Sequence, residues 1–280
     1  MAAKKRLERT GVMLATPLDD KLLESFPNVC LAQPKLNGER CRAEWSTDNK
    51  CHTLFSSYGN AFVGLDHIED GLLALFRGVS VDGELYVHGW TRERIHSIVS
   101  RKTNPHKDAA LIEYHIFDII SDKMQIDRTN KLITFFSNPS LQIVESIGVT
   151  KEGIPSMAAD FVTLGYEGMI LRNPNGFYEP KRSKFLAKFK PSKTDRYLII
   201  GSIEEVDKEG YPKNTLGALK VQDHSGNIFN VGTGNALTKL SRKHLWERRD
   251  TIPGRFAVVK HSLIYTNGGF PTCTSLVEVE

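Results

Sequence analysis

Hydrophobic and polar positions follow two different periods along the first two-thirds of the chain. Residues 66–78 place apolar side chains three or four positions apart and end at Gly78, which is typical of an amphipathic helix. Residues 91–103, 140–148 and 156–165 are also predicted helices. Apolar, β-branched and aromatic segments predict strands at 29–36, 41–45, 79–89, 111–120, 167–173 and 184–190.

An Asn37-Gly38 pair stands between the first two of these strands. Asn-Gly is a favoured pair for a tight turn between antiparallel strands, so the sequence predicts a β-hairpin here. The hairpin would present Lys35 and Arg40 on adjoining strands.

Beyond residue 196 the pattern changes to short apolar alternations that are interrupted by glycine and asparagine. Strands are predicted at 197–206, 218–223, 228–232, 256–265 and 274–280. Short strands at this close spacing predict a small barrel or sandwich, with a hinge near residues 191–196.

Composition fits one large or two modest globular domains. The chain has 280 residues, of which 40% are hydrophobic and 25% charged, and its formal net charge is +4. This mild excess of positive charge permits a polyanionic partner. The 4 cysteines form no Cys-x-x-Cys pair, and no leader or membrane-spanning run is visible. We therefore expect a cytoplasmic protein without a structural zinc site or membrane contact.

Three lysines in or beside predicted strands are candidates for chemistry. Lys35 is a candidate nucleophile, because a lysine amine attacks electrophiles once burial or neighbouring positive charge lowers its pKa. Lys188 and Lys190 alternate with apolar residues, so both project from one face of a strand and are suited to an anion. Taken singly, each lysine also fits an ordinary solvent-facing strand or turn.

Carboxylates and an aromatic ring in the same strands leave alternatives open. Asp82 and Glu84 flank a glycine and mark either a turn or a site for Mg²⁺ or a ribose hydroxyl. Glu167 heads an apolar strand, where metal binding or an ion pair with Arg172 would offset its burial. Phe117 is either core or a platform on which a base stacks.

The order of these segments resembles the motif series of the covalent nucleotidyltransferase superfamily. KLNGER, DGELY, the aromatic of YHIFD, EGMILR and KFK follow one another along the chain as that family's motifs do. VMLATPL, upstream of them, resembles the segment that opens the adenylation domain of ATP-dependent DNA ligases. These ligases are the family to which the chain is most similar.

The resemblance implies an α+β fold in two parts. Residues 1–193 would form an adenylation (nucleotidyltransferase) domain of antiparallel sheets and helices, and residues 194–280 a small β-barrel OB-fold. Because only about ten residues precede VMLATPL, a minimal, viral- or phage-like form is implied, acting in the host cytoplasm if it is viral.

The resemblance also implies a role for each matching residue. Lys35 would attack ATP and carry AMP as a phosphoramidate. The nucleotide would be bound by Gln33 at the adenine edge, Phe117 by stacking, Arg40 and Glu84 at the ribose, and Lys188 and Lys190 at the phosphates. Arg40 would alternatively contact the nick phosphate. Glu84 and Glu167 would hold Mg²⁺ or Mn²⁺.

The implied reaction seals nicks in double-stranded DNA. AMP would join Lys35, move to the 5′-phosphate of the nick and be displaced by the 3′-hydroxyl. The enzyme would be a monomer whose DNA contacts come from the basic stretches at 91–107, 181–196 and 241–249. RNA ligation, capping by guanylyl transfer, and nick binding with weak catalysis are the alternatives.

Two segments depart from the family's pattern. Ser57 and Tyr58 precede a glycine where Ser-Arg-x-Gly is usual. Phe270 and Pro271 match the aromatic-proline core of a terminal basic motif, but its flanking cations are missing. Either Lys260 or Arg255 would then substitute, or the transfer of AMP to Lys35 would be slow.

Overall fold

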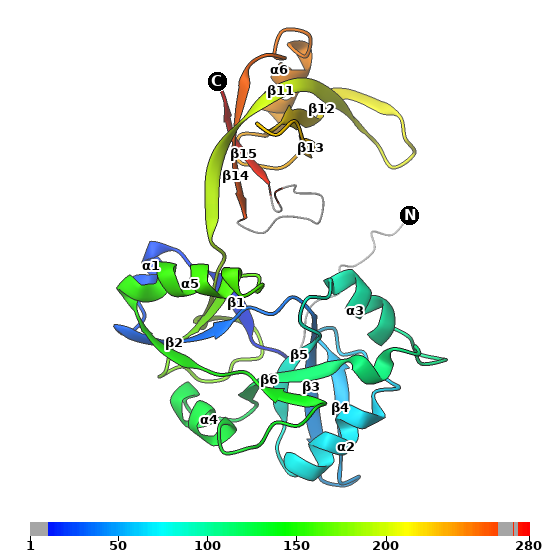
Figure 1. The fold of residues 1–280 in the computed structure, drawn as a ribbon, viewed down its shortest axis with the longest axis vertical. Helices are drawn as coiled ribbons and strands as arrows, with labels where there is room; N and C mark the ends of the chain where they lie inside the picture. Colours follow the sequence, from blue (N-terminus) through cyan, green and yellow to red (C-terminus); the bar gives the residue numbers. More distant parts are fainter. Residues whose placement is uncertain (1–10, 263–270, 272–273) are drawn as a thin grey trace. The chain divides into compact units, whose positions relative to one another are not determined.

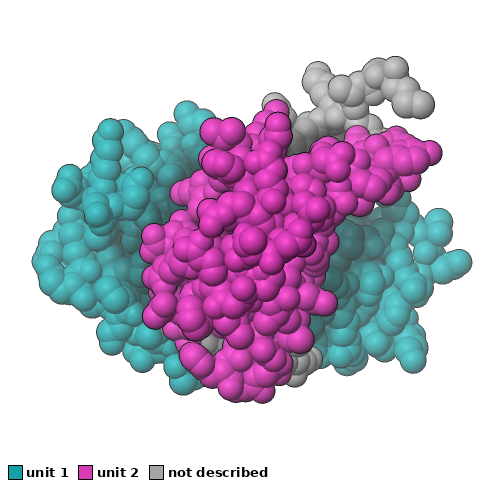
Figure 2. Space-filling view, turned by 90° about the horizontal axis from the view of Figure 1, so that it is seen from above, with its two compact units in different colours: residues 1–190 teal, residues 191–280 magenta. Residues whose placement is uncertain are grey.

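The chain folds into two compact units, residues 1–190 and residues 191–280 (Figure 2). The computed structural model describes residues 11–262, 271 and 274–280. Unit 1 contains two five-stranded sheets with helices, and unit 2 contains one five-stranded sheet with one described helix (Figure 1). In the part of the chain that is described, no helix has both the length and the apolar character that crossing a membrane requires.

The first sheet of unit 1 has the strand order β1-β10-β9-β2-β8. Its neighbours are antiparallel except for β1 and β10. Cys30 and Ala32 of β2 share a buried core with Ile154 and Ala158 of helix α5. The elements are β1 (Leu14–Pro17), α1 (Asp20–Glu24), β2 (Val29–Pro34), β8 (Ile147–Thr150), η2 (Lys151–Gly153), α5 (Ile154–Thr163), β9 (Met169–Arg172) and β10 (Arg182–Phe189).

The second sheet of unit 1 has the order β4-β3-β5-β6-β7 and is antiparallel except between β6 and β7. Ile68 and Leu72, four residues apart on α2, are fully buried in its core. Burial of each such side chain contributes about 1.5–3 kcal/mol. The elements are β3 (Glu39–Ser46), β4 (Cys51–Ser56), α2 (Asp66–Leu75), β5 (Val81–Tyr86), α3 (Arg92–Val99), η1 (Ala109–Leu111), β6 (Glu113–Ile119), α4 (Gln125–Leu132) and β7 (Leu141–Ile143).

The hairpin predicted at Asn37-Gly38 is wrong. Strand β2 pairs with β8 and β9, whereas β3 pairs with β4 and β5, so the segment connects two different sheets. Gly38 is needed for another reason: a Cβ atom there would lie 2.1 Å from the carbonyl oxygen of Leu85 on β5. The glycine therefore permits the chain to pass close to the second sheet.

The helix predicted over residues 140–148 is also wrong, because this segment contains β7 and the start of β8. Its apolar spacing fits both periods, and pairing with β6 and β2 decides the outcome. Helix α4 was not predicted, since its buried side chains are the polar residues Gln125, Arg128 and Thr129 together with Leu132. The remaining strand and helix predictions of unit 1 match the described elements, apart from their ends.

Unit 2 has an antiparallel sheet with the order β13-β12-β11-β14-β15. Its elements are β11 (Ser192–Val206), β12 (Pro212–Gln222), β13 (Ile228–Val231), α6 (Lys239–Glu247), β14 (Phe256–Ser262) and β15 (Ser275–Val279). In the described residues the strand pairs do not close into a barrel. A single backbone hydrogen bond of 2.7 Å, from Leu276 to Thr233, links the segment after β13 to β15.

Candidate functional site

Both sheets of unit 1 line a cavity of about 420 Å³. The first sheet contributes residues of β2, β9 and β10, and the second contributes residues of β3, β5 and β6. Asp82 does not border this cavity, whereas the eight residues to which the family resemblance assigns catalysis, nucleotide binding or metal binding all do: Gln33, Lys35, Arg40, Glu84, Phe117, Glu167, Lys188 and Lys190. The fold thus brings together segments that lie up to 157 positions apart, from residue 33 to residue 190.

Lys35 and Glu167 form the centre of the cavity's charged side. The Lys35 amide donates to the Gly168 carbonyl at 2.9 Å, and the Glu167 amide donates to the Lys35 carbonyl at 3.0 Å. This backbone pairing places the Lys35 ammonium in an ion pair with the Glu167 carboxylate. Glu167 binds Lys190 with its other oxygen, so one carboxylate bridges two ammonium groups.

Charge at this cluster changes the pKa values of its members. Burial alone would raise the pKa of Glu167, but the ammonium groups of Lys35 and Lys190 lower it below the ordinary value. Partial burial lowers the pKa of Lys188, and the positive charges of Lys190 and Lys35 lower it further. The cluster therefore favours an anion in the cavity, which would relieve repulsion among the three lysines.

Glu84 lies on β5 across the cavity from the first sheet's residues. Burial raises its pKa to about 7, although the positive charges of Arg40 and Lys35 oppose the shift. Its Oε1 accepts a 3.2 Å hydrogen bond from the Gly38 amide. Near neutral pH this carboxyl therefore exchanges between its protonated and charged forms.

Arg40 is held by the protein itself. Its Nε and Nη2 each donate to the Asp82 carboxylate at 2.6 Å, and Nη2 also donates to the Met13 carbonyl at 3.1 Å. Tyr178 donates to the same carboxylate at 2.6 Å. The Arg40 guanidinium lies 4.5 Å from the centre of the Phe117 ring. Arg40 thus borders the cavity and supports the Phe117 ring, in a geometry fixed by Asp82.

Glu167 does not pair with Arg172 in the described structure. Arg172, which also borders the cavity, instead donates to Gln33 at 2.6 Å and to Asp118 at 2.7 Å. Asp118 also accepts a 2.8 Å bond from Arg128. Sequence reasoning missed Asp118 and Arg128, although Asp118 is a carboxylate in an apolar strand, which is the signal that identified Glu167.

The segments that depart from the family's pattern have separate locations. Ser57 and Tyr58 line the cavity, directly after β4. Phe270 lies outside the described residues. Arg255 donates to the Glu280 carbonyl at 2.8 Å within unit 2.

One arginine of the predicted DNA contacts is engaged elsewhere. Arg242 on α6 donates to the carbonyls of Leu216, Gly217 and Gly232 at 2.7–2.9 Å, so it joins the helix to the sheet. The Arg242 guanidinium is therefore occupied by contacts within unit 2.

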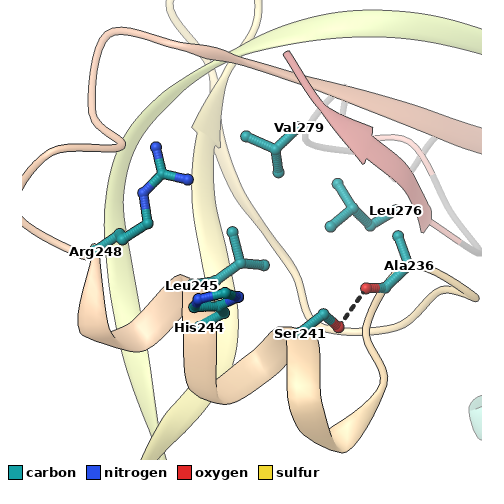
Figure 3. Close-up of a pocket in the computed structure, with 7 residues that line it drawn as sticks. All are labelled: Ala236, Ser241, His244, Leu245, Arg248, Leu276 and Val279. Atoms are coloured by element: carbon teal, nitrogen blue, oxygen red, sulfur yellow. Dashed lines mark hydrogen bonds between the residues drawn. The ribbon is translucent and has the colours of Figure 1, made fainter.

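Unit 2 has a cavity of a different kind, shown in Figure 3. It measures about 250 Å³ and lies between α6 and β15. Leu245, Leu276 and Val279 supply an apolar lining, and His244 and Arg248 stand on the helix side (Figure 3). None of the eight residues predicted to serve the nucleotide or the metal borders it, whereas Ser241, His244 and Arg248 belong to the basic stretch 241–249.

The family of the chain follows from its sequence over most of unit 1. Residues 12–190 match the family model of the ATP dependent DNA ligase domain. The chain belongs to the ATP-dependent DNA ligase family. The family expected from the order of the motifs is thereby confirmed. A cavity that contains Lys35 and the carboxylates of Glu84 and Glu167 is consistent with this family.

Known relatives agree with this assignment. The chain is 31% identical over 224 residues to a DNA ligase of African swine fever virus (strain Badajoz 1971 Vero-adapted), covering 71% of this chain and 52% of the relative. It is 28% identical over 169 residues to a DNA ligase of Haemophilus influenzae, covering 59% of this chain and 61% of the relative. The chain therefore spans about half the length of the viral relatives.

Solved structures share the fold. A Lig E DNA ligase superposes with a TM-score of 0.73 at 23% identity, covering 96% of this chain and 99% of that chain. The ATP-dependent DNA ligase of bacteriophage T7, in complex with ATP, superposes with a TM-score of 0.56 at 15% identity, covering 96% of this chain and 98% of that chain. The mixed α/β fold with antiparallel sheets is thus that of DNA ligases.

Proposed function

We propose that this chain seals nicks in duplex DNA with ATP, through AMP carried on Lys35. The observation that supports this most strongly is the convergence of eight motif residues on one cavity of about 420 Å³. The cavity offers Lys35 as a nucleophile and Phe117 as a ring on which a base can stack. Lys188 and Lys190 offer two further ammonium groups for phosphates. Family membership supports the same reaction.

In the first step the Lys35 ammonium loses one proton to solvent, and its Nζ then attacks the α-phosphorus of ATP. A nitrogen–phosphorus bond forms, the bond to the bridging oxygen breaks, and pyrophosphate leaves with the electron pair. Glu167, which pairs with Nζ, is placed to take the proton that the amine gives up. Lys188 and Lys190 would neutralise phosphate charge, which is the main requirement of phosphoryl transfer.

A divalent cation, Mg²⁺ or Mn²⁺, would be held by Glu84 and Glu167. Both carboxylates border the cavity, and Mg²⁺ is commonly bound by one or two carboxylates together with substrate phosphates. The described residues contain no group of three or more acidic, histidine or cysteine ligands, so nucleotide oxygens and water would complete the coordination. The ion would neutralise charge that develops on the phosphates.

The remaining parts of the proposal concern the rest of the chain. Residues 1–193 would act as the adenylation domain and residues 194–280 as an OB-fold, an assignment that the five-stranded antiparallel sheet of unit 2 supports. The nucleotide would be bound as the motif order implies, with Gln33 at adenine, Phe117 stacked on it, and Arg40 and Glu84 at the ribose. The enzyme would be a monomer and would bind nicked double-stranded DNA.

A nick-sealing assay with ATP and Mg²⁺ tests the proposal. Wild type is expected to seal a nicked duplex, and Lys35→Ala to seal none. Lys131→Ala is the control, because Lys131 is exposed on α4, does not border the cavity and lies outside the basic stretches predicted to contact DNA, so it should seal like wild type.

Two results would contradict the proposal. Wild type that binds nicks and seals none would favour a nick-binding protein. A lysine adduct that forms only with GTP would instead favour guanylyl transfer in capping.

A further inference from the structure

The amide of Gln33 is held at both ends. Gln33 lies on β2, borders the site cavity and is only 2% exposed. Its Oε1 accepts a 2.6 Å hydrogen bond from Nε of Arg172. Its Nε2 donates to Ser146 Oγ at 2.9 Å and to the Phe117 carbonyl at 3.1 Å.

The chemistry of these partners allows only one orientation of the amide. A guanidinium has donors and no acceptor, so the Gln33 oxygen must face Arg172. A backbone carbonyl has no donor, so the Gln33 NH₂ group must face Phe117. Rotating the amide by half a turn would set donor against donor and oxygen against oxygen.

Arg172 is itself fixed by buried charge. Its Nη1 donates to Asp118 at 2.7 Å and to Gln125 at 3.1 Å. Asp118 is shared with Arg128, and both of these side chains are 1% exposed. Because a buried charge without a partner is costly, the shared carboxylate holds Arg172 in this position.

This orientation determines what Gln33 offers a ligand. Both amide hydrogens have acceptors within the protein. The Oε1 atom receives one hydrogen bond from the described residues, which leaves it a second lone pair. A base next to Gln33 is therefore favoured when it presents an amine and disfavoured when it presents a keto oxygen.

We propose that Arg172 and Ser146 are specificity-determining positioning residues, which lock the Gln33 amide so that the site selects a nucleotide with an exocyclic amine on its base. The inference rests on the proposed function, since it concerns the nucleotide that Lys35 attacks. Arg172 fixes the carbonyl end of the amide, and Ser146 accepts the shortest hydrogen bond of the NH₂ group, at 2.9 Å against 3.1 Å for Phe117 and 3.5 Å for Val144, and so keeps that hydrogen from a keto oxygen.

The test compares ATP with inosine triphosphate, which carries a keto oxygen in place of the amine. The rate of covalent nucleotide transfer to Lys35 is measured for each at limiting concentration. Wild type should prefer ATP by roughly 10- to 100-fold, because one hydrogen bond is replaced by an oxygen–oxygen contact. Diaminopurine riboside triphosphate, which keeps the amine, should react at a rate close to that of ATP.

Three variants separate positioning from folding. Arg172→Lys keeps a positive charge near Asp118 but removes the Nε donor, so the preference for ATP should fall towards one. Ser146→Ala, on a partly exposed loop, should lower the preference several-fold. Thr129→Val is the matched control, because Thr129 accepts from Gln125 in the same buried cluster and is not bonded to Gln33. It should keep the wild-type preference.

The outcomes are distinct. Equal use of ATP and inosine triphosphate by wild type overturns the inference while leaving the proposed function intact. An unchanged preference in Ser146→Ala and Arg172→Lys, or an equal loss in Thr129→Val, overturns the positioning roles. No adduct with any nucleotide overturns the proposed function, and this inference with it.

Discussion

The two units of the molecule differ in the burial of their aspartate and arginine side chains. Among the described residues, the buried aspartates and arginines all lie in unit 1: Arg42, Asp82, Asp118, Arg128 and Arg172. The core of unit 2 is mainly aliphatic, with Tyr197 hydrogen-bonded to the buried His261 ring, and one of its ion pairs, between Lys213 and Glu205, is at the surface. Its cavity is lined mainly by apolar side chains (Figure 3).

The difference indicates that unit 1 holds its cavity residues in a fixed geometry at a cost in the free energy of unfolding. Removing charges from water is expensive, and a buried pair seldom stabilises a fold more than apolar residues of similar volume. In unit 1 the buried pairs hold Arg40 beside Phe117 and Arg172 beside Gln33. We therefore attribute these pairs to the positioning of cavity residues.

The largest effect is expected from Glu167→Gln. The variant removes the carboxylate that bridges Lys35 and Lys190 and that would bind the metal, so transfer of AMP to Lys35 should slow by about 100- to 1000-fold. Glu205→Gln breaks the surface pair in unit 2 and should leave the rate unchanged. If AMP transfer to Lys35 were equally fast in Glu167→Gln and Glu205→Gln, the charged groups of unit 1 would have no special role in the reaction.

A large loss of stability is expected from Asp118→Asn. Two buried arginines would lose their shared carboxylate, and breaking a buried pair costs about 3–5 kcal/mol. Hydrogen exchange of peptides from β6 and α4 measures the loss in unit 1 separately from unit 2. Protection equal to that of wild type would show that the buried network is dispensable to the fold.

Unit 2 should respond to the loss of apolar volume. Leu276 is buried and borders the cavity in Figure 3, so Leu276→Ala should destabilise unit 2 by about 2–3 kcal/mol. Hydrogen exchange in β14 and β15 should increase, while β2 and β5 keep their protection. A matching loss of protection in β2 and β5 would mean that the two units do not unfold independently.

A smaller effect that depends on pH is expected from Glu84. Burial raises its pKa from 4.5 to about 7 in the folded chain, so the stability contributed by its protonated form is present below pH 4.5 and lost as the pH rises through 7. Glu84→Gln should therefore gain stability relative to wild type between pH 5 and pH 8. The gain should be about 1–3 kcal/mol.

Exchange protection of β5, measured for both proteins at these two pH values, checks the prediction. The prediction fails if the difference between wild type and variant is the same at both.

Periodicity and turn residues predicted most strands and helices because these elements depend on local pattern. They failed where partners distant in sequence decide the outcome. Residues 140–148 form strands since β6 and β2 offer pairing edges, and Asn37-Gly38 connects two sheets since Gly38 must pass close to Leu85. The strands predicted in unit 2 were found within the described residues, without a closed barrel.

The order of the motifs along the chain predicted which residues line the cavity of unit 1. All eight residues predicted to serve the nucleotide or the metal border one cavity, but the side chains that hold them were not foreseen. Asp82 fixes Arg40, and Asp118 with Arg128 fixes Arg172. Such partners come from other strands and helices, and a single sequence carries no pattern that pairs them.

Peptide mapping of the covalent adduct tests the central claim most directly. The protein is incubated with ATP and Mg²⁺ without DNA, digested, and analysed by mass spectrometry. We predict that the peptide containing Lys35 gains one AMP group, and that the peptides containing Lys188 and Lys190 gain none. An adduct on another lysine, or no adduct in a preparation that seals nicks, would contradict the account.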